Sequence, residues 1–165
     1  RLKASTITLD EIDSPTFLGR RQQHINFRAT TLLDYSGLRD GSESGITVYM
    51  TGNYRYDLSV RRVGDKSVLS LSYYLGALRH VEREIQITGN RVYIRVEGGE
   101  DLYSFSYSTD GKQYEKPGNI DTRFISSETA GGFTGIYLGL FAHSKTENSS
   151  YADFDWFEYV HLPGK

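Results

Sequence analysis

Closely spaced carboxylates are the residues of this sequence that come nearest to catalytic chemistry. They form three clusters: Glu82 with Glu84; Glu97 with Glu100 and Asp101; and Asp153 with Asp155 and Glu158. Residues two apart in a strand point to the same face, and hydrolysis of a glycosidic bond usually needs two carboxylates roughly 5–9.5 Å apart. Alternating charge on the solvated face of a strand produces the same spacing. We interpret these carboxylates as surface charges and predict no catalytic residue in the chain.

The sequence contains no other motif for catalysis or for binding a metal or cofactor. Its four histidines lack metal-ligand spacing such as H-x-x-x-H: His24, His80, His143 and His161. It has no G-x-S-x-G motif, and Gly132–Gly135 does not have the form of a phosphate-binding loop. The absence of cysteine excludes disulfides and thiolate metal sites. We predict no cofactor, while the residues leave open a calcium ion held by backbone carbonyls.

Length and charge narrow the class of protein. The 165 residues suit one domain, and we assign residues 1–165 to it, with residues 1–13 as a linker or a first strand. The chain carries 19 Lys or Arg against 21 Asp or Glu, a net charge of −2. Binders of nucleic acid or of anionic membranes carry a basic excess, and no apolar run approaches the ~20 residues of a membrane span. We predict neither kind of partner.

The sequence indicates no cellular compartment. Exported proteins without cysteine are common, so the lack of cysteine does not separate a cytoplasmic from a periplasmic or secreted protein. The chain begins with Arg1 rather than Met, and we expect it to be a piece of a longer protein.

Alternation of apolar and polar residues is the main structural signal. In residues 54–60, for example, Tyr56, Leu58 and Val60 alternate with polar side chains. The pattern predicts strands over residues 24–33, 46–50, 54–60, 68–75, 81–87, 91–97, 102–108, 136–142 and 151–160. Tight turns are predicted at 88–91 and 109–112, a longer polar loop at 34–45, and no helix of useful length. The fold class is therefore all-β, an antiparallel β-sandwich or jelly roll.

Aromatic residues are abundant, with 13 Tyr and eight Phe. Tyrosine suits half-buried strands, with its ring in the core and its hydroxyl in water, and it also suits stacking on sugar rings; we favour the structural interpretation. Asp153–Phe157 places aromatic residues on both faces of a strand, which favours a partner domain covering one of them. Arg20 and Arg21 are candidates for salt bridges at such an interface.

An ordered set of short motifs covers nearly the whole chain. The set comprises Ser14-Pro15, Phe17–His24, Gly45–Tyr49, Asn53–Tyr56, the Asp110-Gly111 hairpin, Gly132–Gly135 and Ala152–Phe157. Together these motifs resemble the C-terminal domain of glycoside hydrolase family 43 β-xylosidases. The resemblance implies a concanavalin-A-like sandwich of two antiparallel sheets. It also implies an accessory role beside an N-terminal catalytic propeller that hydrolyses xylo-oligosaccharides or arabinoxylan, often with α-L-arabinofuranosidase activity and with inversion at the anomeric carbon.

The same resemblance implies one substrate-binding residue, Phe133. In the family, a loop of the sandwich reaches over the propeller and places a phenylalanine at the mouth of the pocket, and Phe133 matches that position. The flanking glycines permit a sharp turn, and an aromatic ring can wall a sugar subsite. A structural role for Phe133, as a core or hairpin-corner residue, stays open at this point.

Two other functions fit the sequence. One is a stand-alone carbohydrate-binding or lectin-like module in which an exposed tyrosine or Trp156 stacks on sugar rings. The other is a structural interaction domain that makes homo-oligomer contacts, since family members often assemble as dimers or tetramers. In every case we expect the isolated chain to be inactive as an enzyme, because the carboxylates of the family mechanism belong to the propeller.

Overall fold

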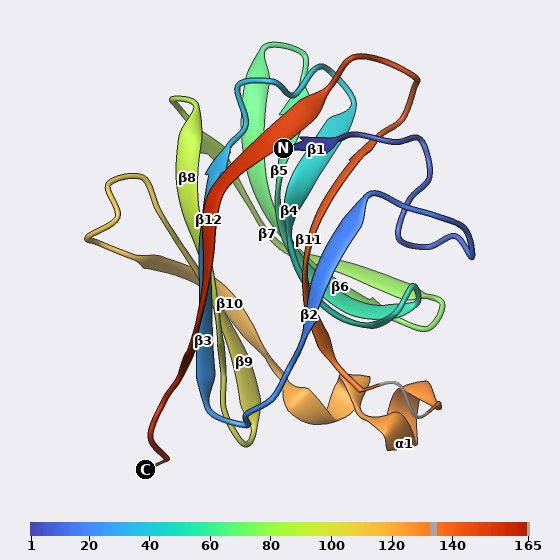
Figure 1. Ribbon diagram of the computed structural model, residues 1–165, viewed down its shortest axis with the longest axis vertical. Coiled ribbons are helices and arrows are strands. Elements are labelled where there is room, and N and C mark those ends of the chain that lie inside the picture. Colours follow the sequence, from blue (N-terminus) through green and yellow to red (C-terminus); the bar gives the residue numbers. More distant parts are fainter. Residues whose placement is uncertain (133–134, 165) are drawn as a thin grey trace.

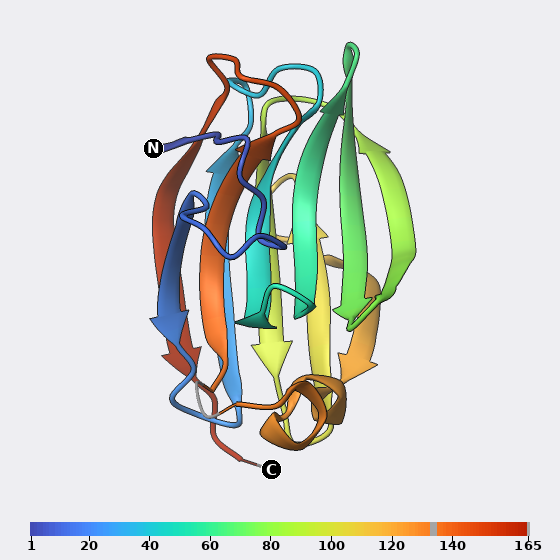
Figure 2. The same cartoon turned by 90° about the vertical axis from the view of Figure 1, so that its right-hand side faces the viewer.

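The protein is a sandwich of two six-stranded sheets in a computed structural model that describes residues 1–132 and 135–164 (Figures 1 and 2). One sheet, called the β3 sheet below, has the order β1 (Leu2–Lys3), β12 (Tyr151–His161), β3 (Phe27–Asp34), β8 (Arg91–Gly98), β9 (Leu102–Ser108), β10 (Glu115–Asp121). The other, the β4 sheet, has the order β2 (Phe17–Arg21), β11 (Tyr137–Ser144), β4 (Ser42–Thr51), β5 (Tyr54–Val63), β6 (Lys66–Leu75), β7 (Leu78–Ile87). All of these strands pair antiparallel. The predicted all-β sandwich is confirmed.

Two short helical turns connect β10 to β11 at one end of the sandwich. They are η1 (Thr122–Ile125) and α1 (Ser127–Ala130), and Figure 1 shows them beside the start of β11. The Asp121 side chain caps η1 by accepting a hydrogen bond from the Arg123 N–H at 2.8 Å. In the described part of the chain, neither helix is long and apolar enough to cross a membrane.

The strand boundaries depart from the sequence prediction where small polar residues pair. Strand β4 begins at Ser42, so the loop expected over residues 34–45 covers only 35–41. Ser42 and Ser44 belong to the strand because their hydroxyls are satisfied inside the sheet: Ser42 Oγ donates to Ser144 Oγ, and Ser44 Oγ donates to the Phe141 carbonyl. Strand β10 was not predicted, because it contains Pro117 and a bulge, as edge strands often do.

The core lies between the sheets and is centred on aromatic residues. The buried Tyr56 ring meets Tyr73, Tyr103 and Phe105 edge to face, with centroids 5.5–6.4 Å apart. The hydroxyl of Tyr56 donates to the Asp121 carbonyl at 3.0 Å. Tyr73 likewise donates to the Asn119 carbonyl, and Tyr35 to that of Thr88. The rings lie in the core as predicted, but these hydroxyls bond to backbone carbonyls.

Residues 4–16 cross the outer face of the β4 sheet, which is the face turned away from the β3 sheet. Figure 2 shows this segment in blue, in front of the strands. Backbone hydrogen bonds fix it to β11 at two points, from Ser144 N to the Ser5 carbonyl and from Ala142 N to the Thr16 carbonyl. Leu9 is buried, and its carbonyl lies against Gly52, where a Cβ would be only 2.5 Å away. The segment therefore covers polar side chains that alternation assigns to a solvated face.

Candidate functional site

Each carboxylate cluster of the sequence has members paired with a neighbouring arginine or histidine. Asp153 Oδ1 accepts a hydrogen bond from Arg1 Nε at 2.9 Å, and this bond holds the pKa of Asp153 below its usual range. Asp155 lies 3.4 Å from Arg91. A carboxylic acid that donates a proton to a glycosidic oxygen needs a raised pKa instead. The geometry of this cluster supports its interpretation as surface charge.

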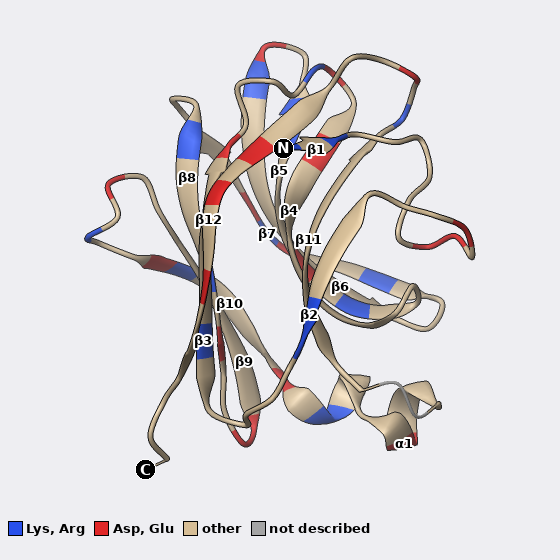
Figure 3. Ribbon diagram, viewed as in Figure 1, with Lys and Arg blue, Asp and Glu red and all other residues tan. Residues whose placement is uncertain are grey.

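The other two clusters follow the same pattern. Glu84 pairs with Arg61, and Glu82 with His80 at 2.9 Å. Glu97 accepts a hydrogen bond from Arg28 at 2.8 Å. Over residues 1–132 and 135–164, no group of three or more His, Cys, Asp or Glu side chains could hold a metal ion. Basic and acidic residues are interspersed along the ribbon (Figure 3).

Two motifs far apart in the sequence meet at one corner of the sandwich. Strand β2 runs antiparallel to β11 with Arg21 opposite Tyr137, and Gln22 N donates to the Ile136 carbonyl at 2.9 Å. The Phe17–His24 motif therefore lies beside Gly135, the last residue of the second motif. We call this region the β2–β11 corner; it comprises residues 17–25 and 135–139 with Tyr103 and Tyr159.

The packing of the Phe17 ring explains why the first motif has a glycine at position 19. The Phe17 ring lies so close to Gly19 and Gly139 that a Cβ on either would come within 2.5 Å of a ring carbon. The ring also packs against Tyr49, with centroids 5.2 Å apart. The two glycines thus give the ring a flat backbone surface across the β2–β11 pair.

Polar bonds fix the second part of the motif. The Tyr103 hydroxyl donates to Gln22 Oε1 at 2.8 Å, and Gln22 Nε2 donates to the His24 carbonyl at 2.9 Å. The Tyr159 hydroxyl accepts the backbone N–H groups of Gln23 and His24, at 3.2 and 3.1 Å. Because Tyr159 is in β12, the corner is fastened to both sheets.

The arginines of the motif have partners inside the domain. Arg20 lies over the Tyr159 ring, 4.3 Å from its centroid, and donates to Gln23 Oε1 at 2.9 Å. The Arg21 guanidinium lies against Gly135, where a Cβ would be 2.9 Å from Nη2. Within the described part of the chain, neither arginine has a carboxylate partner within 4.0 Å. The interface salt bridges expected from them stay a prediction.

The loop that precedes β11 carries the predicted substrate-binding residue. Phe133 lies outside the described residues. The glycines around it, Gly131, Gly132 and Gly135, have φ values of 72°, 83° and 71°, a region that favours glycine. At the same end of the sandwich, Ile25 and Phe124 are exposed to 60% and 46%. The corner therefore has an exposed apolar side chain, Ile25, near a loop whose described glycines have positive φ values.

The aromatic residues of β12 divide between the two faces. Phe154, Phe157 and Tyr159 pack against the core, and a register shift separates Phe154 from Phe157. Trp156 points outward, 40% exposed, with its ring centroid 6.2 Å from that of Tyr93. The outward aromatic surface expected from this segment is present.

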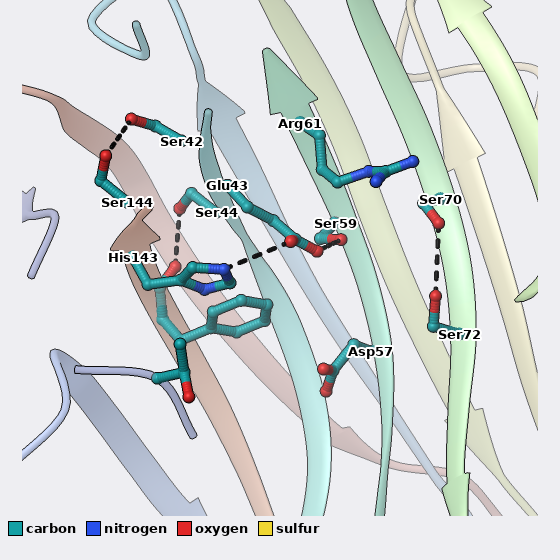
Figure 4. A network of polar contacts seen from close by, with 12 residues as sticks. Ser42, Glu43, Ser44, Asp57, Ser59, Arg61, Ser70, Ser72, His143 and Ser144 are labelled. Carbon is teal, nitrogen blue, oxygen red and sulfur yellow. Dashed lines mark hydrogen bonds and ion pairs between the residues drawn. The ribbon is translucent and has the colours of Figure 1, made fainter. Parts of the chain in front are cut away.

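Sequence reasoning missed a buried polar network on the outer face of the β4 sheet. Arg55 and Asp57 face away from the core on β5, yet their side chains are only 4% exposed, and Arg55 Nε lies 2.9 Å from Asp57 Oδ2. Burial raises the pKa of Asp57, and the Arg55 charge opposes that rise. Close by, Glu43 accepts a hydrogen bond from Ser59 and lies 3.4 Å from His143 (Figure 4). The alternation places these residues on a polar face but does not show that residues 4–16 cover it.

Comparison with known proteins assigns this architecture to a protein family. Residues 1–160 match the family described as the β-xylosidase C-terminal Concanavalin A-like domain. The chain is similar to a non-reducing end α-L-arabinofuranosidase of Bacteroides ovatus, with 30% identity over 96% of this chain and 30% of that protein. It is also similar to a xylosidase/arabinosidase of Humicola insolens, with 28% identity over 86% of this chain and 29% of that protein.

A solved structure shows the same fold. The family 43 protein of a Bacteroides ovatus xyloglucan locus superposes with a TM-score of 0.89 and 27% identity, over 97% of this chain and 32% of that one. This chain thus spans about 30% of the length of the relatives it matches.

Proposed function

This chain belongs to the family of β-xylosidase C-terminal Concanavalin A-like domains, and from this premise we propose that it is an accessory domain of a longer glycoside hydrolase. In this role it closes the substrate pocket of a separate catalytic propeller and stabilises it. The substrate class we propose is a xylo-oligosaccharide or arabinoxylan. The names of the relatives, xylosidase/arabinosidase and α-L-arabinofuranosidase, support that class.

The observation that carries the proposal is the β2–β11 corner. A loop with three positive-φ glycines starts from a base that is fixed by the Ile136–Gln22 backbone bond and by the Tyr103–Gln22 and Tyr159–His24 bonds. A loop whose base is held in place and whose glycines allow sharp turns can project a residue toward a neighbouring domain. We assign the substrate-contacting role on this loop to Phe133, as a wall of a sugar subsite.

The charges of the domain support a role without catalysis of its own. Each carboxylate cluster has at least one arginine or histidine partner, and the pKa of Asp153 is lowered rather than raised. Inverting hydrolysis needs one carboxylic acid that stays protonated and a second carboxylate that activates water. The chemistry is therefore assigned to the propeller.

The test is the hydrolysis of aryl β-xyloside and aryl α-L-arabinofuranoside by the purified 165-residue chain. The expected result is no turnover above the blank. Turnover that survives further purification and disappears after substitution of one of the paired carboxylates would refute an accessory role.

Trp156 favours a second candidate function, a carbohydrate-binding module. Its exposed ring beside Tyr93 forms an outward aromatic surface on the β3 sheet, and such surfaces stack on sugars. Affinity electrophoresis on xylan and arabinoxylan separates this candidate from the first. Retarded migration that is lost in Trp156→Ala supports the module, and unretarded migration removes it.

A further inference from the structure

Strand β2 is an edge strand of the β4 sheet and pairs only with β11 (Figure 1). Two backbone bonds at the ends of this pair fix its pattern: Ala142 N donates to the Thr16 carbonyl, and Gln22 N donates to the Ile136 carbonyl. Hydrogen-bonded and non-bonded residue pairs alternate along an antiparallel ladder. The even-numbered residues of β2 therefore bond to β11, and the odd-numbered residues direct their backbone groups to the free side.

The free side of β2 presents the N–H and C=O groups of Phe17, Gly19 and Arg21. Within residues 1–132 and 135–164, none of these groups has a backbone partner. Gly19 has no side chain to shield them, and residues 18–21 are all exposed. An unpaired row of this kind can bond to a strand of another domain or chain.

The other edges of the two sheets are interrupted. Strand β7 contains an extra residue, Glu82, where its register with β6 shifts. Strand β10 contains Pro117 and a register shift. On the remaining edge, β1 has only two residues, and β12 beyond it has a register shift. Such interruptions keep edge strands from pairing with other chains. Strand β2 is short but has neither a proline nor a shift over its five residues, so its edge is the one most open to a partner.

The side chains along β2 give this edge an apolar and basic character. Leu18 is 63% exposed, although Leu140 directly opposite is buried in the core, and Ile25 just after the strand is 60% exposed. Arg20 and Arg21 are exposed too. Among the described residues, neither has a carboxylate oxygen within 4.0 Å. A strand added here would cover the leucine and meet two guanidinium groups that lack a carboxylate partner.

A second copy of this chain is a poor partner for the edge. Antiparallel pairing of β2 with itself about Gly19 would place Leu18 of one copy opposite Arg20 of the other. The two Arg20 side chains would then lie on the same face, about 7–8 Å apart across the diagonal. The strand has no carboxylate to offset them. A strand that carries Asp or Glu turns the same charges into attraction, so the arginines select against a copy and for an acidic partner.

We propose that β2 docks on the catalytic domain of the longer enzyme by accepting a short strand with acidic side chains, whose carboxylates pair with Arg20 and Arg21. The identity of the partner rests on the proposed function. This chain spans about 30% of the length of its relatives, so a further domain has room for such a strand. The extended form and the acidic character of the partner follow from the free backbone groups and the two arginines.

This docking would act on the β2–β11 corner directly. The Arg21 guanidinium lies against Gly135, and the next residue, Ile136, bonds to Gln22. A strand held by β2 on one side and by the catalytic domain on the other would fix the base of the loop that precedes β11 relative to the substrate pocket.

Hydrogen exchange of single amides tests the docking in the isolated 165-residue chain and in the longer enzyme, at the same low concentration. In the isolated chain, the amides of Leu18 and Arg20 should be protected, whereas those of Phe17, Gly19 and Arg21 should exchange rapidly. In the longer enzyme, the three rapid amides should slow by at least about tenfold. The alternation is the signature of an added strand, because each of its bonds goes to an odd-numbered residue.

Two outcomes would overturn the proposal. If the amides of Phe17, Gly19 and Arg21 exchange equally fast in both proteins, the edge is free in the longer enzyme. If they become protected in the isolated chain as its concentration rises, the partner is a second copy. Neither outcome depends on turnover, by which the accessory role is tested, so the docking surface and the accessory role can fail separately.

A pair of double variants of the longer enzyme tests the acidic character of the partner. Arg20→Glu with Arg21→Glu should return the three odd-numbered amides to the rate of the isolated chain, because carboxylates would then face carboxylates. Arg79→Glu with Arg83→Glu makes the same change on the exposed β7 edge and should leave them slow. Protection of the β5 amides in both variants checks that the domain is folded. Slow exchange that survives in the first variant, or equal loss in both, would overturn the acidic strand.

Discussion

Asp10 and Arg55, which are 45 residues apart in the sequence, meet at 2.5 Å between Oδ1 and Nη1 and fasten the N-terminal segment over β5. On its other side Arg55 pairs with Asp57 at 2.9 Å. Asp10 is half exposed, whereas Asp57 is buried. The two carboxylates thus hold the same guanidinium in very different surroundings.

This difference predicts unequal effects of two similar substitutions. Asp57→Asn leaves a buried guanidinium short of its buried partner, and we expect a loss of about 3–5 kcal/mol in unfolding free energy. Asp10→Asn removes a half-exposed partner and should cost no more than about 1 kcal/mol. Urea denaturation of both variants measures the two values. Equal costs would contradict the expectation that the buried Asp57–Arg55 pair contributes more to stability than the half-exposed Asp10–Arg55 pair.

Gly135 should be intolerant of a side chain because of its backbone conformation. Its φ is +71°, and a Cβ would meet the Arg21 guanidinium at 2.9 Å. Gly135→Ala should destabilise the domain by about 1 kcal/mol because of the backbone conformation. The contact should add little, since the guanidinium is the far end of an exposed, flexible side chain. Gly131→Ala is the control, since Gly131 has φ +72° with nothing within 4 Å of a Cβ.

A double variant tests whether the contact matters. Arg21→Ser should leave the cost of Gly135→Ala within about 0.5 kcal/mol of its value in the natural chain, because the guanidinium can move aside. Thermal unfolding of the natural chain, the two single variants and the double variant gives the coupling. A coupling well above about 0.5 kcal/mol would show that Arg21 is held rigidly against Gly135.

Asp110 gives the β9–β10 hairpin a pH-dependent contribution to stability. Its carboxylate accepts hydrogen bonds from the N–H groups of Gln113 and Lys112 and from Ser108 Oγ, which lower its pKa to about 2 from the usual 3.8. A lowered pKa in the folded state means that the stabilisation is present above pH 3.8 and is lost as the pH falls toward 2.

We therefore expect the difference in melting temperature between the natural chain and Asp110→Ala to be constant above about pH 5 and to shrink between pH 4 and pH 2. A carbon-13 NMR titration of Asp110 should have its midpoint near pH 2. A midpoint near 3.8, or a difference that grows on acidification, would show that the turn does not bind the ionised carboxylate.

Much of the fold could be predicted from the sequence, because strands that face both a core and an exterior reveal themselves by alternation. Strands β5, β6, β8 and β9 were placed within a few residues for this reason. Strand β2 was not, since Phe17–Arg21 has apolar, small and charged residues in succession and serves as an edge strand. Strand β10 was not predicted either, because its proline and its bulge interrupt the alternation.

The two motifs of the candidate site could be recognised in the sequence, but their proximity in the fold could not be predicted. What joins them is the antiparallel pairing of β2 with β11 and the bond from His24 to Tyr159, which is 135 residues away. Such long-range pairings leave no local pattern. The burial of Arg55 and Asp57 was hidden as well, because it depends on how residues 4–16 cross the sheet.

In a longer enzyme, Phe133→Ala should raise KM or lower kcat for aryl xylosides while leaving the melting temperature unchanged. The reason is that an aromatic wall excludes water and orients the sugar without supporting the core. Phe124→Ala, at an exposed aromatic residue of the same end, is the matched control and should leave the kinetics unchanged. Kinetics that are unchanged in Phe133→Ala would remove this residue from the site.

The most direct measurement of the central claim is complementation of a catalytic propeller. The propeller of the longer enzyme is produced without residues 1–165, and its hydrolysis of aryl β-xyloside is measured with and without added chain. An accessory domain should have no activity alone and should increase the kcat/KM of the propeller by about tenfold or more, and a chain with Phe133→Ala should increase it less. Full activity of the propeller without the chain, or turnover by the chain alone, would contradict the account.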